Sequence, residues 1–246
     1  MPYQHILVDD PRPRVRRITL NRPEKRNALN LALSEALFDA LLEADSAANV
    51  RAIVLTGAGP AFCAGADLSE FAALSSANAA LVERRADITA KLHGVFSQLT
   101  KPVVTAINGA AMGGGAGLAL AGDIAVMSAT AKLGYPEVKH GIVASVVMAN
   151  LVRQAGRKAA FELVATGEAI EAARALELGL VNRVVALQML MHEALQSARA
   201  MAAVAPQAMA ATKSLFYRVA ELPFDQALEA GREMNQRMRA FRKDKP

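Results

Sequence analysis

The sequence predicts an α/β fold built mainly on parallel strands. Short apolar segments rich in β-branched residues alternate along the chain with longer segments whose apolar residues recur at helical spacing. That alternation is typical of α/β proteins with parallel pairing. The chain has 246 residues, of which 53% are hydrophobic and 21% charged, so it can bury a sizeable core. Intrinsic disorder and fibrous architectures are excluded by the same composition.

The expected elements follow one another in a regular order. Strands are expected at 15–20, 51–56, 103–107 and 123–127, and helices at 30–47 and 81–99. A glycine cluster within 109–122 is expected to open a further helix. Beyond about Ala186 the strand signal disappears, and helices are expected at 192–204 and 224–241, separated by Pro206 and Pro223. We therefore predict an α/β core at 1–185 and a helical C-terminal oligomerisation region at 186–246.

Charge and cysteine content exclude several classes of site. Lys and Arg number 28 and Asp and Glu 23, a formal charge of +5 that fits an anionic small molecule as well as nucleic acid. Cys63 is the only cysteine, so neither an intramolecular disulfide nor a multi-cysteine metal site can form. This usage suits a reducing compartment, and the N-terminal segment lacks a signal-peptide pattern. A cytoplasmic protein is the expectation.

The longest uncharged run, Pro102–Gly122, has the length of a bilayer span. It contains Asn108 and six glycines, three of them consecutive, which weaken a continuous helix and would leave backbone groups unsatisfied in lipid. We expect a buried strand, a turn and a buried helix there, and no membrane association.

Nucleotide-binding and metal-binding motifs fail on inspection. The segment 57–62 follows a strand, but Phe62 stands where the dinucleotide fingerprint needs its third glycine, and no P-loop pattern exists. The histidines are scattered and form no metal-ligand pair, so no metal is expected; they are His5, His93, His140 and His192. Cys63 is expected to be a small buried thiol rather than a nucleophile, because no histidine stands near it in sequence.

Two predicted strands each run into a turn of small residues. The turn 61–67 follows the strand 51–56, and the turn 109–115 follows the strand 103–107. Small residues leave backbone N–H groups uncovered at a helix N-terminus, where the helix dipole favours negative charge. Two such N–H groups aimed at one point would form an oxyanion hole. The glycines could equally serve only tight turns and close helix packing, and the residues alone leave both interpretations open.

Five segments in order resemble the crotonase superfamily, also called the enoyl-CoA hydratase/isomerase family, over essentially the whole chain. They are Ile18–Asn30, Ala61–Leu68, Ala106–Gly115, Gly134–Val138, and Thr166-Gly167 followed by Ala175–Asn182. The resemblance implies a crotonase-like spiral of β-β-α units with a helical C-terminal subdomain. It also implies an acyl-CoA thioester substrate, a homotrimer or dimer of trimers, and no cofactor beyond the coenzyme A carried within the substrate.

The resemblance also implies the residues of the site. The two oxyanion-hole amides fall on Ala66 and Gly114, with the thioester carbonyl between them. Contacts to CoA fall on Arg26, Ala28, Ala64, Asp67 and Leu68, with Arg26 the expected phosphate partner. In the family a neighbouring subunit's C-terminal Phe and Lys often cover the adenine, and the candidates here are Phe241 and Lys243. Ordinary solvated surface is the alternative for these basic residues.

The reaction depends on the acid and base groups. Family hydratases usually carry two glutamates, and this chain retains one as Glu137 but has Gly117 in place of the other. We rank hydration of a 2-enoyl-CoA first, double-bond isomerisation second and decarboxylation third, with non-catalytic acyl-CoA binding also open. For proton transfer near neutral pH, Glu137 is expected to be partly buried with a raised pKa.

Two further properties are expected of the ligand site. The wall of the acyl pocket is expected to involve 71–85 and 142–148. Nucleic acid is an unlikely partner, because aromatic residues make up 4% of the chain and Trp is absent, which leaves poor stacking platforms.

Overall fold

A six-stranded sheet forms the centre of the molecule. The computed structural model describes residues 3, 5–70 and 78–243, without the side chains of 240–243. The sheet order is β1-β2-β3-β5-β7-β10. Its strands are β1 (Ile6–Arg12), β2 (Val15–Leu20), β3 (Ala52–Gly57), β5 (Val103–Ile107), β7 (Ile124–Ser128) and β10 (Arg183–Val185). Within the described strands of this sheet only the β1–β2 pair is antiparallel, so the predicted mainly parallel α/β fold is confirmed, while β1 and β10 were missed.

A second, smaller sheet pairs the two segments that we predicted as small-residue turns. Its order is β4-β6-β8-β9, with β4 (Ala61–Cys63), β6 (Ala110–Met112), β8 (Lys132–Gly134) and β9 (Ile170–Glu171). Strands β4 and β6 pair in parallel, with Ala61 opposite Ala110 and Cys63 opposite Ala111. The prediction of plain turns was therefore wrong in detail. The pairing places the segments that follow β4 and β6 next to each other.

Helices connect and cover the two sheets. They are α1 (Leu31–Ser46), α2 (Ala79–Gly94), α3 (Gly114–Ala121), α4 (Met148–Thr166), α5 (Ala172–Glu177), α6 (Leu187–Ala202), α7 (Pro206–Val219) and α8 (Phe224–Lys243). The 3₁₀ turns are η1 (Pro23–Lys25), η2 (Leu68–Glu70), η4 (Val95–Ser97) and η5 (Pro136–His140). Helix α1 begins at Leu31 because the Asn30 side chain accepts a hydrogen bond from the backbone N–H of Leu33 at 2.9 Å.

Three helices of this set were not predicted. Helices α4 and α5 were missed, and α7 was missed because Pro206 was interpreted as a separator. Pro206 is in fact the first residue of α7, where its missing N–H costs nothing. Helix α2 also ends earlier than expected, at Gly94, and continues as the 3₁₀ turn η4.

The core lies on both faces of the large sheet. On one face, residues of α1 and of the α2–α3 region pack against Ile18, Ile53 and Leu55. On the other, α6 packs against Val54, Val104 and Val126. Strands β3 and β5 are buried almost throughout, which explains why their sequences are continuously apolar rather than alternating. The predicted division at 185/186 lies close to the start of α6 at Leu187. A division of the chain into two units stays a prediction.

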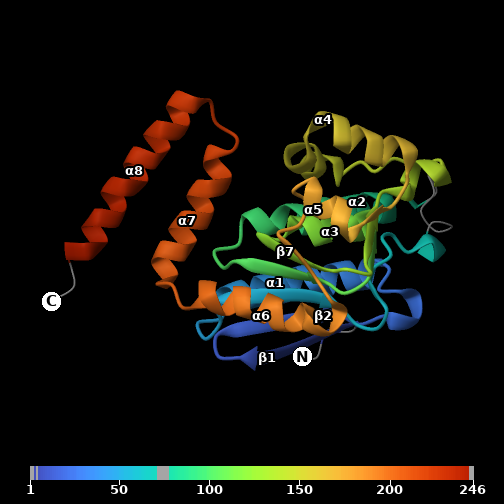
Figure 1. Cartoon of the computed structure of the whole chain (residues 1–246), viewed down its shortest axis with the longest axis horizontal. Coiled ribbons are helices and arrows are strands. Elements are labelled where there is room, and N and C mark those ends of the chain that lie inside the picture. The colour runs from blue at the N-terminus through green and yellow to red at the C-terminus, as the bar shows by residue number, and fades with distance from the viewer. Residues whose placement is uncertain (1–2, 4, 71–77, 244–246) are drawn as a thin grey trace.

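The last two helices extend away from the sheets. Figure 1 shows α7 and α8 as an arm beside the α/β body. The second half of α7 is attached to the α/β body by polar contacts with Asp123. Lys213 Nζ lies 2.7 Å from Asp123 Oδ2, and the Tyr217 hydroxyl donates to Asp123 Oδ1 at 2.9 Å. Burial lowers the pKa of Lys213, and Asp123 opposes that shift. Across the described residues, none of the helices has the length and apolar character needed to cross a membrane.

Candidate active site

One cavity of about 200 Å³ brings together the three residues predicted to be catalytic. Ala66, Gly114 and Glu137 all contribute to its wall. The remaining wall consists of Leu29, Ser34, four residues of α2 (Arg85, Thr89, Leu92 and His93) and the segment 142–147. Of the predicted acyl-pocket wall, the part at 71–77 lies outside the described residues. Convergence of the three residues is what the proposed chemistry requires; their catalytic roles stay a prediction.

The backbone segments that contain Ala66 and Gly114 are almost in contact. Gly65 has φ +90°, and a Cβ built on it would lie 2.6 Å from the Met112 carbonyl oxygen and 3.5 Å from the Gly114 nitrogen. Only glycine fits this position without strain. Gly113, with φ +53°, precedes Gly114, and Gly114 is the first residue of α3. The Gly114 N–H therefore has no acceptor within its own helix.

A different local structure leaves the backbone N–H of Ala66 outside the backbone pairing. Leu29 and Ala66 form an isolated parallel bridge, in which Leu29 donates to the Gly65 carbonyl at 2.7 Å and accepts from the Asp67 N–H at 3.0 Å. The bridge uses the Gly65 carbonyl oxygen and the Asp67 N–H and does not use the N–H of Ala66. The 3₁₀ turn η2 begins at Leu68, directly after the predicted turn 61–67.

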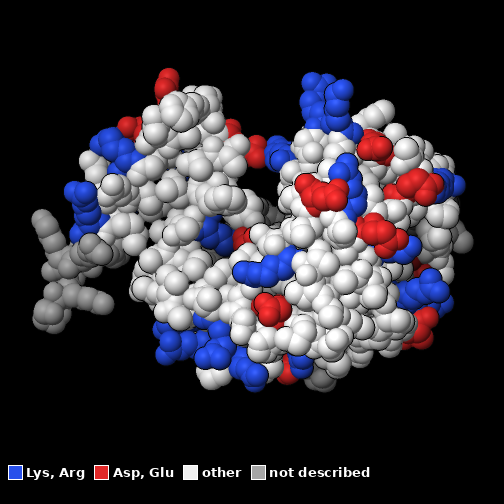
Figure 2. Space-filling view, in the orientation of Figure 1, with Lys and Arg blue, Asp and Glu red and all other residues white. Residues whose placement is uncertain are grey.

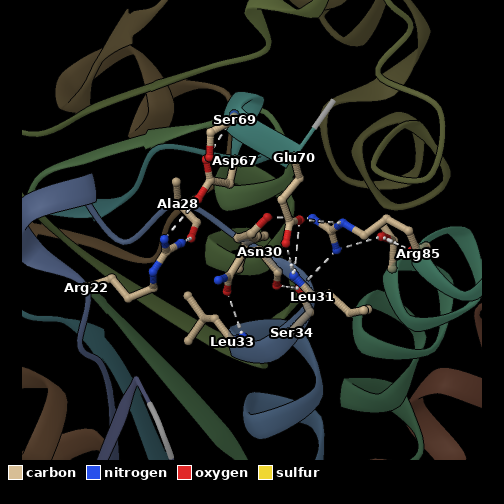
Figure 3. A network of polar contacts seen from close by, with 12 residues as sticks. Arg22, Ala28, Asn30, Leu31, Leu33, Ser34, Asp67, Ser69, Glu70 and Arg85 are labelled. Carbon is tan, nitrogen blue, oxygen red and sulfur yellow. Dashed lines mark hydrogen bonds and ion pairs between the residues drawn. The ribbon is translucent and has the colours of Figure 1, made fainter. Parts of the chain in front are cut away.

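Side-chain networks fix the loop around Ala66 (Figure 3). Arg22 pairs with Asp67 at 2.9 Å, with both side chains buried, and also donates to the Ala28 carbonyl at 2.6 Å. Farther along the loop, Glu70 accepts from the Leu31 N–H at the start of α1 at 3.0 Å and lies 3.7 Å from Arg85 Nε. The loop is thus anchored on both sides of the Ala66 amide.

We expect Asp67→Asn to destabilise the protein by about 1–3 kcal/mol at pH 7, because it leaves the buried Arg22 guanidinium without its counter-ion. Burial raises the pKa of Asp67, but hydrogen bonds from Ser69 and Arg22 outweigh it and hold the pKa below its usual value. The stabilising effect is therefore present above the pKa of the unfolded chain and is lost as pH falls through the lower folded value. Denaturant unfolding at several pH values measures it. Asp9→Asn, which removes the exposed ion pair with Arg17, is the control and should change the free energy of unfolding little. If Asp67→Asn lowered that free energy equally at pH 7 and in acid, the role assigned to Asp67 would be wrong.

Glu137 has the environment of a proton-transfer group. It lies in η5, and its Oε1 lies 2.6 Å from the point where a Cβ on Gly113 would stand. Its Oε2 is buried, and no donor among the described residues reaches it. Burial raises its pKa, against smaller lowering effects of its own backbone N–H and of His140. The expected partial burial and raised pKa of Glu137 are confirmed.

The space beside Gly117 is filled by His93 and Val147. A Cβ on Gly117 would overlap Val147 Cγ1 and lie 2.9 Å from His93 Nε2. No further carboxylate lines the described cavity wall besides that of Glu137. Sequence reasoning treated His93 only as one of four scattered histidines. Its spacing of four residues from Thr89 and eight from Arg85 was a signal that all three lie on one face of α2.

The CoA-binding candidates lie on two segments that run side by side. The N–H of Ala64 donates to the Arg26 carbonyl at 3.0 Å, and Ala28 and Asp67 flank the Leu29–Ala66 bridge. Arg26 is exposed, as is Leu68 at 53%. Phe241 and Lys243 stand on the last turn of α8, which lies away from α2 and α3 in the same chain (Figure 1), and their side chains are outside the described set. None of these contacts to CoA is tested by the structure.

Other chemistry receives no support from this site. Cys63 is fully buried and donates to the Asn27 carbonyl at 3.1 Å, and burial raises the pKa of Cys63 to about 12, which keeps the thiol protonated. Among the described residues, no group of three His, Cys, Asp or Glu side chains is placed to hold a metal ion. On the face shown in Figure 2 most of the surface is uncharged, with acidic and basic side chains side by side on the right and a basic group at the lower left.

The fold and the cavity together define a class of enzyme, the crotonase superfamily. Residues 12–245 match the family model described as "Enoyl-CoA hydratase/isomerase". The chain belongs to the enoyl-CoA hydratase/isomerase family and is an enzyme of that type.

Three relatives illustrate the match. A Thermus thermophilus protein, provisionally named an enoyl-CoA hydratase, is 40% identical and covers 93% of this chain and 94% of its own length. The 2,3-dehydroadipyl-CoA hydratase of Escherichia coli is 37% identical, with coverage of 92% and 85%. The crystal structure of enoyl-CoA hydratase from Bacillus anthracis superposes with a TM-score of 0.90 at 35% identity, covering 95% of this chain and 90% of that one.

Proposed function

We propose that the protein adds water across the double bond of a 2-enoyl-CoA to give a 3-hydroxyacyl-CoA. The observation that supports this most directly is the buried Oε2 of Glu137, which has no partner among the described residues and lies in the same cavity as the amides of Ala66 and Gly114. The names of the relatives as enoyl-CoA hydratases support the same reaction.

In this proposal the thioester carbonyl oxygen accepts hydrogen bonds from the N–H groups of Ala66 and Gly114. Their polarisation draws electron density toward the oxygen, so the β-carbon becomes electrophilic and an enolate is stabilised. The Glu137 carboxylate removes a proton from water while the water oxygen bonds to the β-carbon. The carboxyl group then returns that proton to the α-carbon as the enolate collapses. One water is consumed, and Glu137 ends in its starting state.

The substrate's CoA part is proposed to lie along 26–28 and 64–68, with Arg26 toward the phosphates. No separate cofactor is needed, since coenzyme A enters as part of the thioester. We also propose that the chain works as a homotrimer or dimer of trimers, as the family resemblance implies, and that it works in the cytoplasm, since a single cysteine suits a reducing compartment.

Isomerisation of a 3-enoyl-CoA is the second candidate, and one observation favours it. His93 and Val147 occupy the space beside Gly117, so within the described wall Glu137 is the single carboxylate. One base suffices to remove a proton from the α-carbon of the 3-enoyl thioester and return it at the γ-carbon, which moves the double bond into conjugation. A water held for hydration, by contrast, gains from a second group.

Absorbance measurements with two substrates distinguish the candidates. We expect crotonyl-CoA mixed with the enzyme to lose the ultraviolet absorbance of its conjugated enoyl thioester as water adds. A 3-enoyl-CoA would instead gain that absorbance if the enzyme is an isomerase. If neither signal changes while a saturated acyl-CoA still binds, both proposals fail, and decarboxylation or non-catalytic acyl-CoA binding takes their place.

A further inference from the structure

The imidazole of His93 connects α2 to the first turn of α3. The side chain is buried, with 6% of its surface exposed, and it lines the cavity. Its Nδ1 lies 2.9 Å from the Thr89 carbonyl oxygen, and its Nε2 lies 3.1 Å from the Gly114 carbonyl oxygen. The ring also packs against the backbone of Gly117, one turn along α3. His93 therefore contacts the residue that we propose as one of the two amide donors.

The start of α3 needs such support from outside. Its first residues are Gly114-Gly115-Ala116-Gly117, and glycine has the lowest helix propensity after proline. Gly113 stands at the N-cap position with φ +53° and supplies no side-chain hydrogen bond to the helix. An oxyanion hole acts only when its donors are held in place before the reaction. A rigid ring braced against Gly114 and Gly117 supplies that constraint.

We propose that His93 is a positioning residue: by donating from Nε2 to the Gly114 carbonyl, it fixes the first turn of α3 and so aims the Gly114 N–H into the cavity. The proposal rests on the proposed function, because it assigns His93 to the oxyanion hole of that reaction. Neutral imidazole has one N–H, so the two carbonyl contacts are not equivalent. The proposal places the proton on Nε2.

Two amide side chains separate the two ring nitrogens experimentally. In His93→Gln the amide nitrogen reaches the region of Nε2, whereas in His93→Asn it reaches only that of Nδ1. We expect His93→Gln to keep kcat within about threefold and His93→Asn to lower kcat by about tenfold or more, on the scale of a weakened oxyanion-hole donor. The KM of both should stay near that of the wild type. The exposed His192→Gln on α6 is the matched control and should behave as wild type.

A second readout does not depend on turnover. An acyl-CoA whose acyl group is a cinnamoyl ring with an electron-donating substituent absorbs at longer wavelength when its thioester carbonyl is polarised. We expect this red shift at saturating protein for the wild type and His93→Gln, and a smaller shift for His93→Asn. If Asn and Gln variants give the same kcat and the same shift, or if both lose only thermal stability, His93 merely fills space and the proposal is wrong.

The same probe separates this inference from the proposed reaction. If the wild type fails to hydrate crotonyl-CoA but shifts the probe, and His93→Asn reduces the shift, then the positioning role stands and the reaction is a different one. If the wild type binds the probe without any shift, no polarising hole exists and the inference is overturned. If hydration proceeds and His93→Asn leaves the shift intact, only the inference fails.

Discussion

Glu137→Gln is expected to lower kcat for hydration by about 10³-fold, within the range that a positioned acid or base contributes. The amide cannot take a proton from water, but it keeps the shape of the carboxyl group. The dissociation constant for a saturated acyl-CoA should therefore stay within a few-fold of the wild-type value. Stopped-flow measurement of enoyl absorbance gives the first quantity, and calorimetry gives the second.

The raised pKa of Glu137 adds a pH signature to this prediction. Because burial raises that pKa, the carboxylate needed as the base is lost on acidification at a higher pH than for an exposed glutamate. Between the unfolded and folded pKa values the native state binds more protons, so this group lowers stability as pH rises. We expect Glu137→Gln to be more thermally stable than the wild type at pH 8, with the gap closing in acid.

The control for Glu137→Gln is Glu168→Gln, which removes an exposed carboxylate paired with Lys139 at 2.6 Å. It should keep kcat and change stability little. Glu137 would be excluded from the chemistry if its glutamine variant hydrated crotonyl-CoA at the wild-type rate. It would be assigned a binding role instead if KM rose by the full factor while kcat stayed constant.

The sequence was sufficient for the parallel core because the signals there are local. Segments such as 103–107 are apolar except for Thr105, which is characteristic of strands buried on both faces. β1 escaped because its exposed residues Asp9 and Asp10 gave no apolar pattern. Helix α7 was missed because a proline occurs both at the first position of a helix and after the end of one. The sequence alone does not distinguish the two cases.

The site divides in the same way. Ala66 and Gly114 could be assigned because they lie in segments that resemble the family's motifs, and a motif is a local pattern in the sequence. The contact of His93 with Gly114 could not be predicted, because it depends on how α2 and α3 pack against each other. No local sequence pattern indicates such packing. The same holds for the Arg22–Asp67 pair, whose members stand 45 positions apart in sequence. What remained unpredicted is therefore the set of side chains that contact the segments of Ala66 and Gly114.

Gly65→Ala is expected to lower kcat by about 10²- to 10³-fold, the loss typical of removing an oxyanion-hole donor. The added methyl group would stand 2.6 Å from the Met112 carbonyl oxygen, so the segments of Ala66 and Gly114 must move apart. Because φ is positive at this position, an alanine there also lowers the free energy of unfolding by about 1–2 kcal/mol. Kinetics with crotonyl-CoA and denaturant unfolding measure the two effects.

Gly179→Ala separates backbone strain from displacement of the hole. Gly179 has φ +70°, and no heavy atom lies within 4 Å of a Cβ built there, so alanine adds the conformational cost alone. It should lose stability but keep kcat. The absorbance of the cinnamoyl-CoA probe should then move to longer wavelength with Gly179→Ala as it does with the wild type. With Gly65→Ala it should not move. Equal kinetic losses in both variants would mean that general destabilisation, and not the spacing of the two amides, limits turnover.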